Sequence, residues 1–218
     1  MIVTLVFLFF TLAFMEVLLS GDNAVVLASM ASRLDDEEQQ KKALNIGMVG
    51  SYVLRVLVIV FGVWIFSNPV LGPASKIIGS AYLLYLTYDF FSTSADDKEE
   101  EDKDYTFNGV VASITLTDLA FSLDSATTAL ALSDNLYVIL AACLTGVIAL
   151  RFLAGWFVDL IEKFENLEPA GFIAVGLVGV QLLVGTLFDI EIPELYNIAA
   201  IAVIFGWGFS KRIKEELV

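Results

Sequence analysis

The sequence predicts an all-α, polytopic membrane protein with seven transmembrane helices, arranged as a 3+3 inverted repeat plus one additional helix. Three observations support this prediction. Apolar residues form 58% of the 218 residues and charged residues only 17%, whereas soluble domains have about 45–50% and about 25%. The apolar residues gather in seven long segments. Finally, motifs in the first two segments recur in the fourth and fifth.

The seven apolar segments have lengths that suit a lipid bilayer. They cover residues 2–32, 43–66, 73–92, 106–132, 136–158, 170–188 and 193–210. A helix needs about 20 residues to cross the hydrocarbon core. The first and fourth segments are longer, so each must tilt, protrude or break. If the first segment breaks, Ser20-Gly21 is the expected place, because glycine tolerates irregular backbone conformations.

The distribution of lysine and arginine predicts the orientation in the membrane. With seven spans, nine of the 12 basic residues fall in segments on one side, and only Lys76 falls on the other. Arg55 and Arg151 lie inside spans. Because cytoplasmic loops are enriched in lysine and arginine, the N-terminus is expected outside and the C-terminus in the cytoplasm. The membrane is expected to be the plasma (inner) membrane.

The chain is predicted to form a single membrane domain over residues 1–218. Within it, residues 1–92 form the first three-helix repeat and residues 106–190 the second, inverted one. Residues 191–218 form the seventh helix and a cytoplasmic tail. Between the repeats, residues 93–105 read TSADDKEEEDKDY. This composition is typical of a solvated cytoplasmic linker, and a metal-sensing role for its carboxylates is the alternative.

The repeat is visible in two pairs of motifs. Residues 16–24 read EVLLSGDNA, and residues 118–126 read DLAFSLDSA. In both, an acid is followed six places later by aspartate, a small polar residue and alanine. Residues 50–57, GSYVLRVL, match residues 146–153, GVIALRFL, in the spacing of Gly, Leu, Arg and Leu. Successive units of three spans have opposite orientations, which is the architecture of many secondary transporters.

Four acids inside the spans carry the functional prediction. Glu16 and Asp118 fall near the middle of the membrane, Asp22 toward the cytoplasm and Asp124 toward the outside. An acid at this depth costs about 2.5–3.5 kcal/mol, and such residues mark ion or proton pathways. Together with two neighbouring polar side chains they form the predicted metal site, which consists of Glu16, Asp22, Asn23, Asp118, Asp124 and Ser125.

Two arginines inside the spans bear on this site. Arg55 and Arg151 cannot neutralise four carboxylates, so at least two acids remain without an arginine partner. One interpretation is that the arginines tune the charge of the site, or lock helices together by pairing with the acids when the site is empty. The other is that they form fixed interhelical salt bridges.

The predicted ligands are all oxygen donors. The chain has no histidine and one cysteine, Cys143, which excludes disulfide frameworks and histidine-based zinc or haem sites. Hard or borderline divalent cations such as Mn²⁺, Mg²⁺ or Ca²⁺ suit this donor set, and the residues alone do not distinguish among them. The net charge of -14 argues against nucleic acid as a partner.

These motifs resemble the TerC family of integral membrane proteins, within the LysE-type transporter superfamily. The resemblance rests on Glu16, Gly21-Asp22-Asn23, Asp118 and Phe121–Ser125, and further on residues 42–44, Gly47, Arg55, 82–85, Ile192-Pro193 and Tyr196. It implies a seven-span membrane protein and, for several members, export of manganese from the cytoplasm.

The predicted function is therefore a secondary transporter that exports a divalent metal cation, Mn²⁺ first, by alternating access. Replacement of the metal by protons on the carboxylates would give antiport. The expected partners are the cation, as substrate, and the lipid bilayer, with a homo-oligomer left open. No prosthetic group and no enzymatic activity are expected. The alternative is a non-transporting assembly or insertion factor for membrane proteins, which would need residues 93–105 for its partners.

Overall fold

The structure is a computed structural model that describes residues 2–19, 21–95, 105–133, 135–190 and 194–213. Within these ranges the chain is helical, and the prediction of an all-α protein is confirmed. The helices are α1 (Ile2–Leu19), α2 (Gly21–Ser32), α3 (Glu37–Ser67), α4 (Leu71–Ala95), α5 (Phe107–Leu132), α6 (Leu136–Ile161), α7 (Leu167–Phe188) and α8 (Glu194–Gly208). Each apolar segment expected from the sequence overlaps at least one of them.

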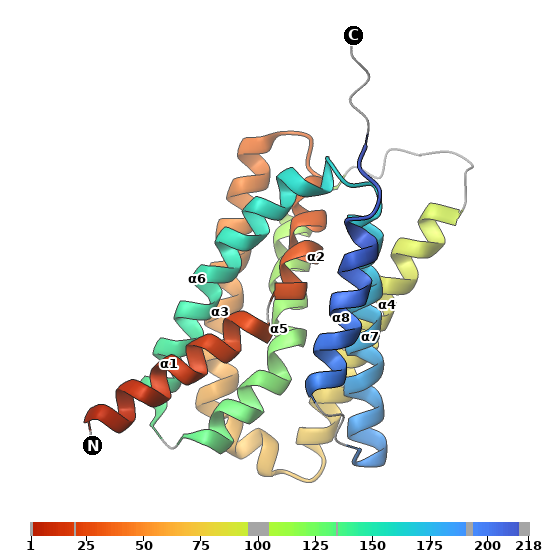
Figure 1. Ribbon diagram of the computed structural model, residues 1–218. Helices are drawn as coiled ribbons and strands as arrows, with labels where there is room; N and C mark the ends of the chain where they lie inside the picture. Colours follow the sequence, from red (N-terminus) through yellow and green to blue (C-terminus); the bar gives the residue numbers. More distant parts are fainter. Residues whose placement is uncertain (1, 20, 96–104, 134, 191–193, 214–218) are drawn as a thin grey trace.

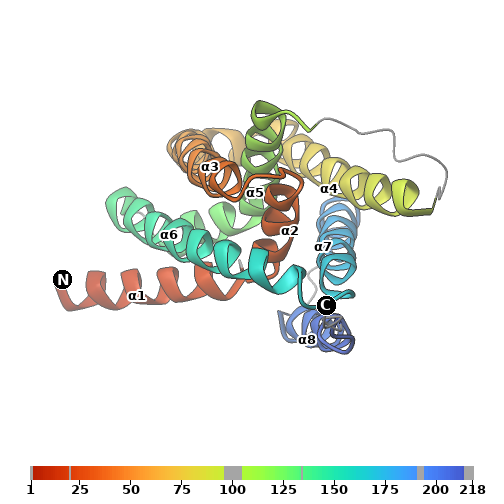
Figure 2. The same cartoon turned by 90° about the horizontal axis from the view of Figure 1, so that it is seen from above.

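The first apolar segment forms two helices. Helix α1 ends at Leu19 and α2 begins at Gly21, on either side of the expected break. The two helices point in different directions: α2 stands upright in the bundle, whereas α1 runs obliquely away from it (Figures 1 and 2). The fourth segment, by contrast, forms the uninterrupted helix α5.

Several helices begin at a polar residue that caps the first turn. The side chain of Asp36 accepts a hydrogen bond from Gln39 N at the start of α3. Thr106 accepts one from Gly109 N at the start of α5, and Asn135 accepts two at the start of α6. Such caps satisfy backbone N–H groups that have no partner within the helix. They place the helix starts at the ends of the bundle, where the chain is polar.

The outer surface of the bundle is apolar, as a lipid environment requires. Within the described residues, three helical stretches are long and apolar enough to cross a membrane, namely Glu37–Gly62, Leu136–Ile161 and Leu167–Phe188. Large apolar side chains face outward, among them Phe14 (67% exposed) and Phe152 (74% exposed). In water such a surface would drive association. The protein is therefore an integral membrane protein, and the count of seven spans stays a prediction.

The helices pair in a regular pattern. Helix α3 packs along α5, and α6 packs along α1 and α2. Helix α4 packs along α7, and α8 lies against the side of α7 (Figures 1 and 2). The two expected repeats match α1–α2 with α5, α3 with α6, and α4 with α7. Under this matching, the packing of α3 on α5 is the counterpart of the packing of α6 on α1 and α2. The packing of α4 on α7 joins two helices that are counterparts of each other. The connection between the two sets of helices falls at the acidic stretch, of which residues 96–104 lie outside the described residues.

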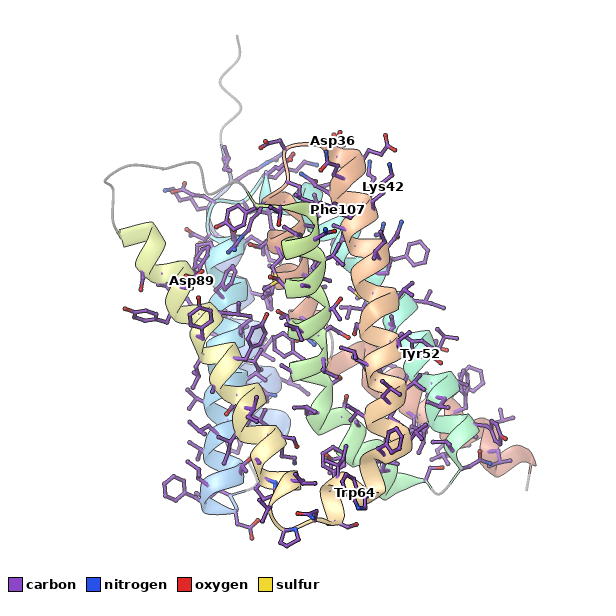
Figure 3. The ribbon with its side chains drawn as sticks, turned by 180° about the vertical axis from the view of Figure 1, so that it is seen from behind. Asp36, Lys42, Tyr52, Trp64, Asp89 and Phe107 are labelled. Atoms are coloured by element: carbon purple, nitrogen blue, oxygen red, sulfur yellow. The ribbon has the colours of Figure 1, made fainter. Side chains whose placement is uncertain are left out.

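Two apolar clusters fill the interior at different heights. Helix α3 runs from Asp36 and Lys42 at one end of the bundle to Trp64 at the other (Figure 3). The upper cluster lies toward the end with Asp36 and centres on Leu27, Leu44, Ile114, Leu150 and Phe172. The lower cluster lies toward the end with Trp64 and comprises Leu12, Ala13, Ile59, Ala126, Ala129, Ile139, Ala142 and Cys143.

A candidate cation site at the centre of the bundle

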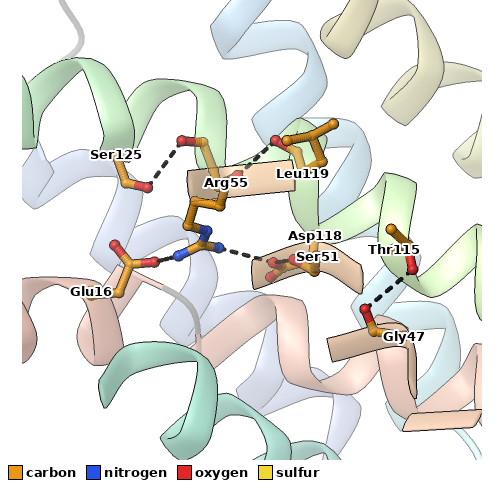
Figure 4. Close-up of polar contacts among 9 residues, drawn as sticks. Glu16, Gly47, Ser51, Arg55, Thr115, Asp118, Leu119 and Ser125 are labelled. Carbon is orange, nitrogen blue, oxygen red and sulfur yellow. Dashed lines mark hydrogen bonds and ion pairs between the residues drawn. The ribbon is translucent and has the colours of Figure 1, made fainter. Parts of the chain in front are cut away.

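Between the two apolar clusters, one arginine bridges two acids. Arg55 of α3 donates from Nη1 to Glu16 Oε1 of α1 and from Nη2 to Asp118 Oδ2 of α5, the latter at 3.0 Å (Figure 4). The three residues are buried, with exposed fractions of 2% for Arg55, 7% for Glu16 and 0% for Asp118. Two acids that the sequence places 102 residues apart thus meet on one guanidinium group.

A serine on the same face of α3 completes the contacts of Asp118. The hydroxyl group of Ser51 donates to Asp118 Oδ2, the oxygen that also accepts from Arg55. Ser51 and Arg55 are four residues apart, so their side chains lie above one another on one helix face. Among the described residues, Asp118 Oδ1 and Arg55 Nε have no hydrogen-bond partner. The formal charge of this group is -1, because it combines two carboxylates with one guanidinium.

Glycine 146 makes room for Glu16. A methyl group at this position of α6 would overlap the Cγ and Cβ atoms of Glu16. Any larger residue would therefore displace the carboxylate from Arg55. The same helix contributes Cys143 to the lower cluster and Val147 to the upper cluster, so Gly146 lies at the height of the site.

The remaining predicted ligands are placed only in part. Asn23 is buried (4% exposed) in the first turn of α2. Ser125 is half-buried on α5, and its hydroxyl group donates to the Ser122 carbonyl at 3.2 Å (Figure 4). The side chains of Asp22 and Asp124 lie outside the described residues. Among the side chains that the structure does describe, no three acids, histidines or cysteines gather in one group. The six-residue metal site therefore stays a prediction.

Two buried hydroxyl groups in this part of the bundle were not predicted from the sequence, and the first of them contacts Asp118. Ser51 lies inside the motif at residues 50–57, and its spacing of four from Arg55 is the signal that could have identified it. The second is Thr117, which is fully buried, lies 3.2 Å from the hydroxyl of Tyr82, and donates to Met30 Sδ. It is adjacent to Asp118 in the sequence, but nothing in its pattern distinguishes it from other threonines in apolar helices.

The second arginine occupies a different environment. Arg151 Nε donates to Asn45 Oδ1 at 2.5 Å, and its Nη2 donates to the Lys41 carbonyl at 3.5 Å. Both partners belong to α3, near the end of the bundle where Lys42 lies (Figure 3). Of the two arginines expected to bear on the acids, the described contacts place only Arg55 among them.

The chemistry of the group favours cations. Two carboxylates from separate helices and a hydroxyl group can supply oxygen donors to a hard or borderline divalent cation. Helix α1 also ends three residues after Glu16, and the last carbonyl groups of a helix have no partner within it.

Comparison with known proteins agrees with this description. Residues 3–213 match the model of the family described as "Integral membrane protein TerC family". The chain is 34% identical to the uncharacterized membrane protein YceF of Bacillus subtilis, over 94% of this chain and 84% of that protein. It is 28% identical to the UPF0053 inner membrane protein YgdQ of Escherichia coli K12, over 94% of this chain and 89% of that protein. No solved structure matches. The chain therefore belongs to the TerC family of integral membrane proteins.

Proposed function

We propose that this protein is a secondary transporter that exports a divalent metal cation, with Mn²⁺ as the first candidate, by alternating access through an intramembrane carboxylate site. One observation carries the proposal: Glu16 and Asp118, from separate segments of the chain, meet in the interior of an apolar helical bundle. Buried acids at membrane depth are costly and usually mark ion pathways. A purely structural role would be served better by apolar side chains of similar size.

The proposed architecture has seven spans that form an inverted repeat. The pairing of the helices supports this architecture. Helix α3 of the first repeat packs on α5 of the second, and α6 of the second repeat packs on α1 and α2 of the first. The third helices of the two repeats, α4 and α7, pack on each other. The acids at the centre belong to corresponding motifs, so they would lie on either side of the pseudo-twofold axis. Transporters built in this way place substrate sites at the repeat interface near the middle of the membrane.

The two apolar clusters support an alternating mechanism. Along α3, Met48 of the upper cluster precedes Ser51 and Arg55, and Ile59 of the lower cluster follows them. Along α6 the order is reversed: Cys143 precedes Gly146, and Leu150 follows it. In this conformation, apolar side chains therefore separate the acids from both ends of the bundle. Opening one cluster at a time would expose the site to one side of the membrane only.

The proposed ligands are Glu16, Asp22, Asn23, Asp118, Asp124 and Ser125. The separation of α1 from α2 supports convergence of the first three. On one continuous helix, residues six apart point about 120° from each other, which would keep Asp22 away from the side on which Glu16 lies. The preference for Mn²⁺ over Mg²⁺ or Ca²⁺ comes from the family resemblance, and the N-outside orientation comes from the distribution of basic residues.

The test is uptake of Mn²⁺ into inside-out membrane vesicles that contain the full chain or its Asp22→Asn and Asp124→Asn variants. We expect Mn²⁺ flux with the wild type and its loss, about tenfold or more, with each variant. Asp189→Asn is the matched control. Asp189 follows the last residue of α7 and adopts a left-handed conformation with φ 54°, which asparagine also adopts readily. Unchanged flux in both site variants would refute the site, and no flux of Mn²⁺, Mg²⁺ or Ca²⁺ with the wild type would refute transport.

A further inference from the structure

We infer that Arg55 is a tethered cation that replaces the metal between Glu16 and Asp118 whenever the site is empty, and that this replacement lets the empty transporter reorient. The inference rests on the proposed function and assigns to Arg55 one step of the transport cycle. The step is the return of the transporter after the metal has been released.

The first argument is the position of the guanidinium group. It bonds to one carboxylate from each half of the chain, Glu16 through Nη1 and Asp118 through Nη2. It thus occupies the position between the two acids that a bridging metal ion would need. Asp118 Oδ2 already accepts hydrogen bonds from Ser51 and Arg55. A divalent cation between the same carboxylates would repel the guanidinium, so the metal and Arg55 compete for one place.

The second argument is charge. Glu16 and Asp118 alone carry a formal charge of -2 in the buried interior of the bundle. With Arg55 between them the formal charge is -1, and with a divalent cation in place of Arg55 it is zero. Removing uncompensated charge from water is costly, and the cost rises with the charge. Because both apolar clusters must close over the site during reorientation, the state with two bare carboxylates is the one that cannot complete this step.

The third argument is the freedom of the arginine to leave. All hydrogen bonds that the structure describes for the Arg55 side chain go to the two acids, and its Nε has no partner among the described residues. A metal ion that occupies the acids therefore removes the interactions that hold the guanidinium. Arg151 differs, because it is held by Asn45 and Lys41 on a neighbouring helix.

The test compares two modes of transport in proteoliposomes that contain the full chain. Net flux of radiolabelled Mn²⁺ down a gradient requires the empty transporter to return. Exchange of labelled for unlabelled Mn²⁺ at equal concentrations requires only the loaded form to move. We expect Arg55→Gln to lower net flux about tenfold or more while exchange falls much less. Arg151→Gln is the matched control and should keep both modes.

Binding gives a second measurement. Removal of a competing cation should make Arg55→Gln bind Mn²⁺ more tightly in detergent, by about tenfold, as measured by titration with Mn²⁺ alone. A residue with only a structural role would weaken binding when replaced. If Arg55→Gln does not fold, Arg55→Lys replaces it in both assays. Its single ammonium group cannot donate from two separate nitrogens, so the ratio of exchange to net flux should still rise.

Three results would overturn the inference. The first is net flux at the wild-type rate in Arg55→Gln, which would mean that protons neutralise the returning site. The second is an equal loss of exchange and net flux in a folded variant. The third is weaker binding of Mn²⁺ by Arg55→Gln. Absence of both transport modes in the wild type would instead refute the proposed function, so the two failures can be told apart.

Discussion

Arg55 and Arg151 occupy the same place in two matching motifs, and their surroundings differ. Arg55 is 2% exposed and bridges Glu16 and Asp118. Arg151 is half-buried and donates to Asn45 Oδ1 and to the Lys41 carbonyl. One arginine therefore belongs to the centre of the bundle and the other to its edge.

The two arginines meet different residues on the neighbouring helices. Arg151, on α6, finds its acceptor in Asn45 of α3. The spacing of 96 residues that relates Gly50 to Gly146 relates Asn45 to Ala141 on α6. Ala141 is exposed, whereas Arg55 is buried and donates to the acids at the centre. A repeated motif thus places two arginines alike in the sequence, and the residues around each one in the fold differ.

The largest difference between the two arginines should be in stability. Arg55→Gln leaves two buried carboxylates without a counter-ion, which typically costs about 3–5 kcal/mol. Arg151→Gln removes contacts at a half-exposed site and should cost less than about 1 kcal/mol. Thermal unfolding in detergent micelles measures both. Replacing Glu16 by glutamine in the Arg55→Gln background should recover part of the loss, and equal destabilisation by the two arginine variants would contradict the comparison.

The matching glycines offer a second, smaller contrast. Gly146→Ala would force a methyl group into the side chain of Glu16, which is held by Arg55, and overpacking of this kind costs about 1–3 kcal/mol. In Gly50→Ala, the nearest atom would be Thr115 Oγ1 at 2.9 Å. To make room, the Thr115 hydroxyl would have to weaken its hydrogen bonds to the Gly47 and Val111 carbonyls, so we expect a smaller cost of about 1 kcal/mol. Unfolding midpoints of the two variants, compared with the wild type, decide the order.

The sequence predicts the helices well because the bilayer leaves few choices. Backbone groups in lipid must be satisfied within the segment, so each long apolar segment becomes helical. The ends are less predictable. Helix α3 begins at Glu37 rather than near residue 43, because Asp36 caps it and Lys41 and Lys42 pair with Glu37 and Glu38 one turn earlier. The hydrophobicity of the sequence does not predict that such polar turns belong to the helix.

The charged residues of the site can be predicted from the sequence, but some of the contacts that they make cannot. Glu16, Asp118 and Arg55 stand out because charged residues in apolar spans are costly. Ser51 and Asn45 do not, because a serine or an asparagine in a helix gives no sign of its partner on another helix. That partner depends on how the helices are rotated against each other, and apolar patterning is a weak guide where helices face lipid as well as protein.

The smallest expected effect comes from the contacts of Arg151. Asn45→Ala removes the side-chain acceptor of Arg151 Nε. Because the described hydrogen bonds of Arg151 go to Asn45 and to the Lys41 carbonyl and not to the acids, we expect the variant to leave Mn²⁺ affinity unchanged in a titration in detergent. Arg55→Gln, which removes the cation between Glu16 and Asp118, is the comparison and should tighten Mn²⁺ binding. If Asn45→Ala changes the affinity as much as Arg55→Gln does, both arginines act on the site and the two halves are more alike than their contacts indicate.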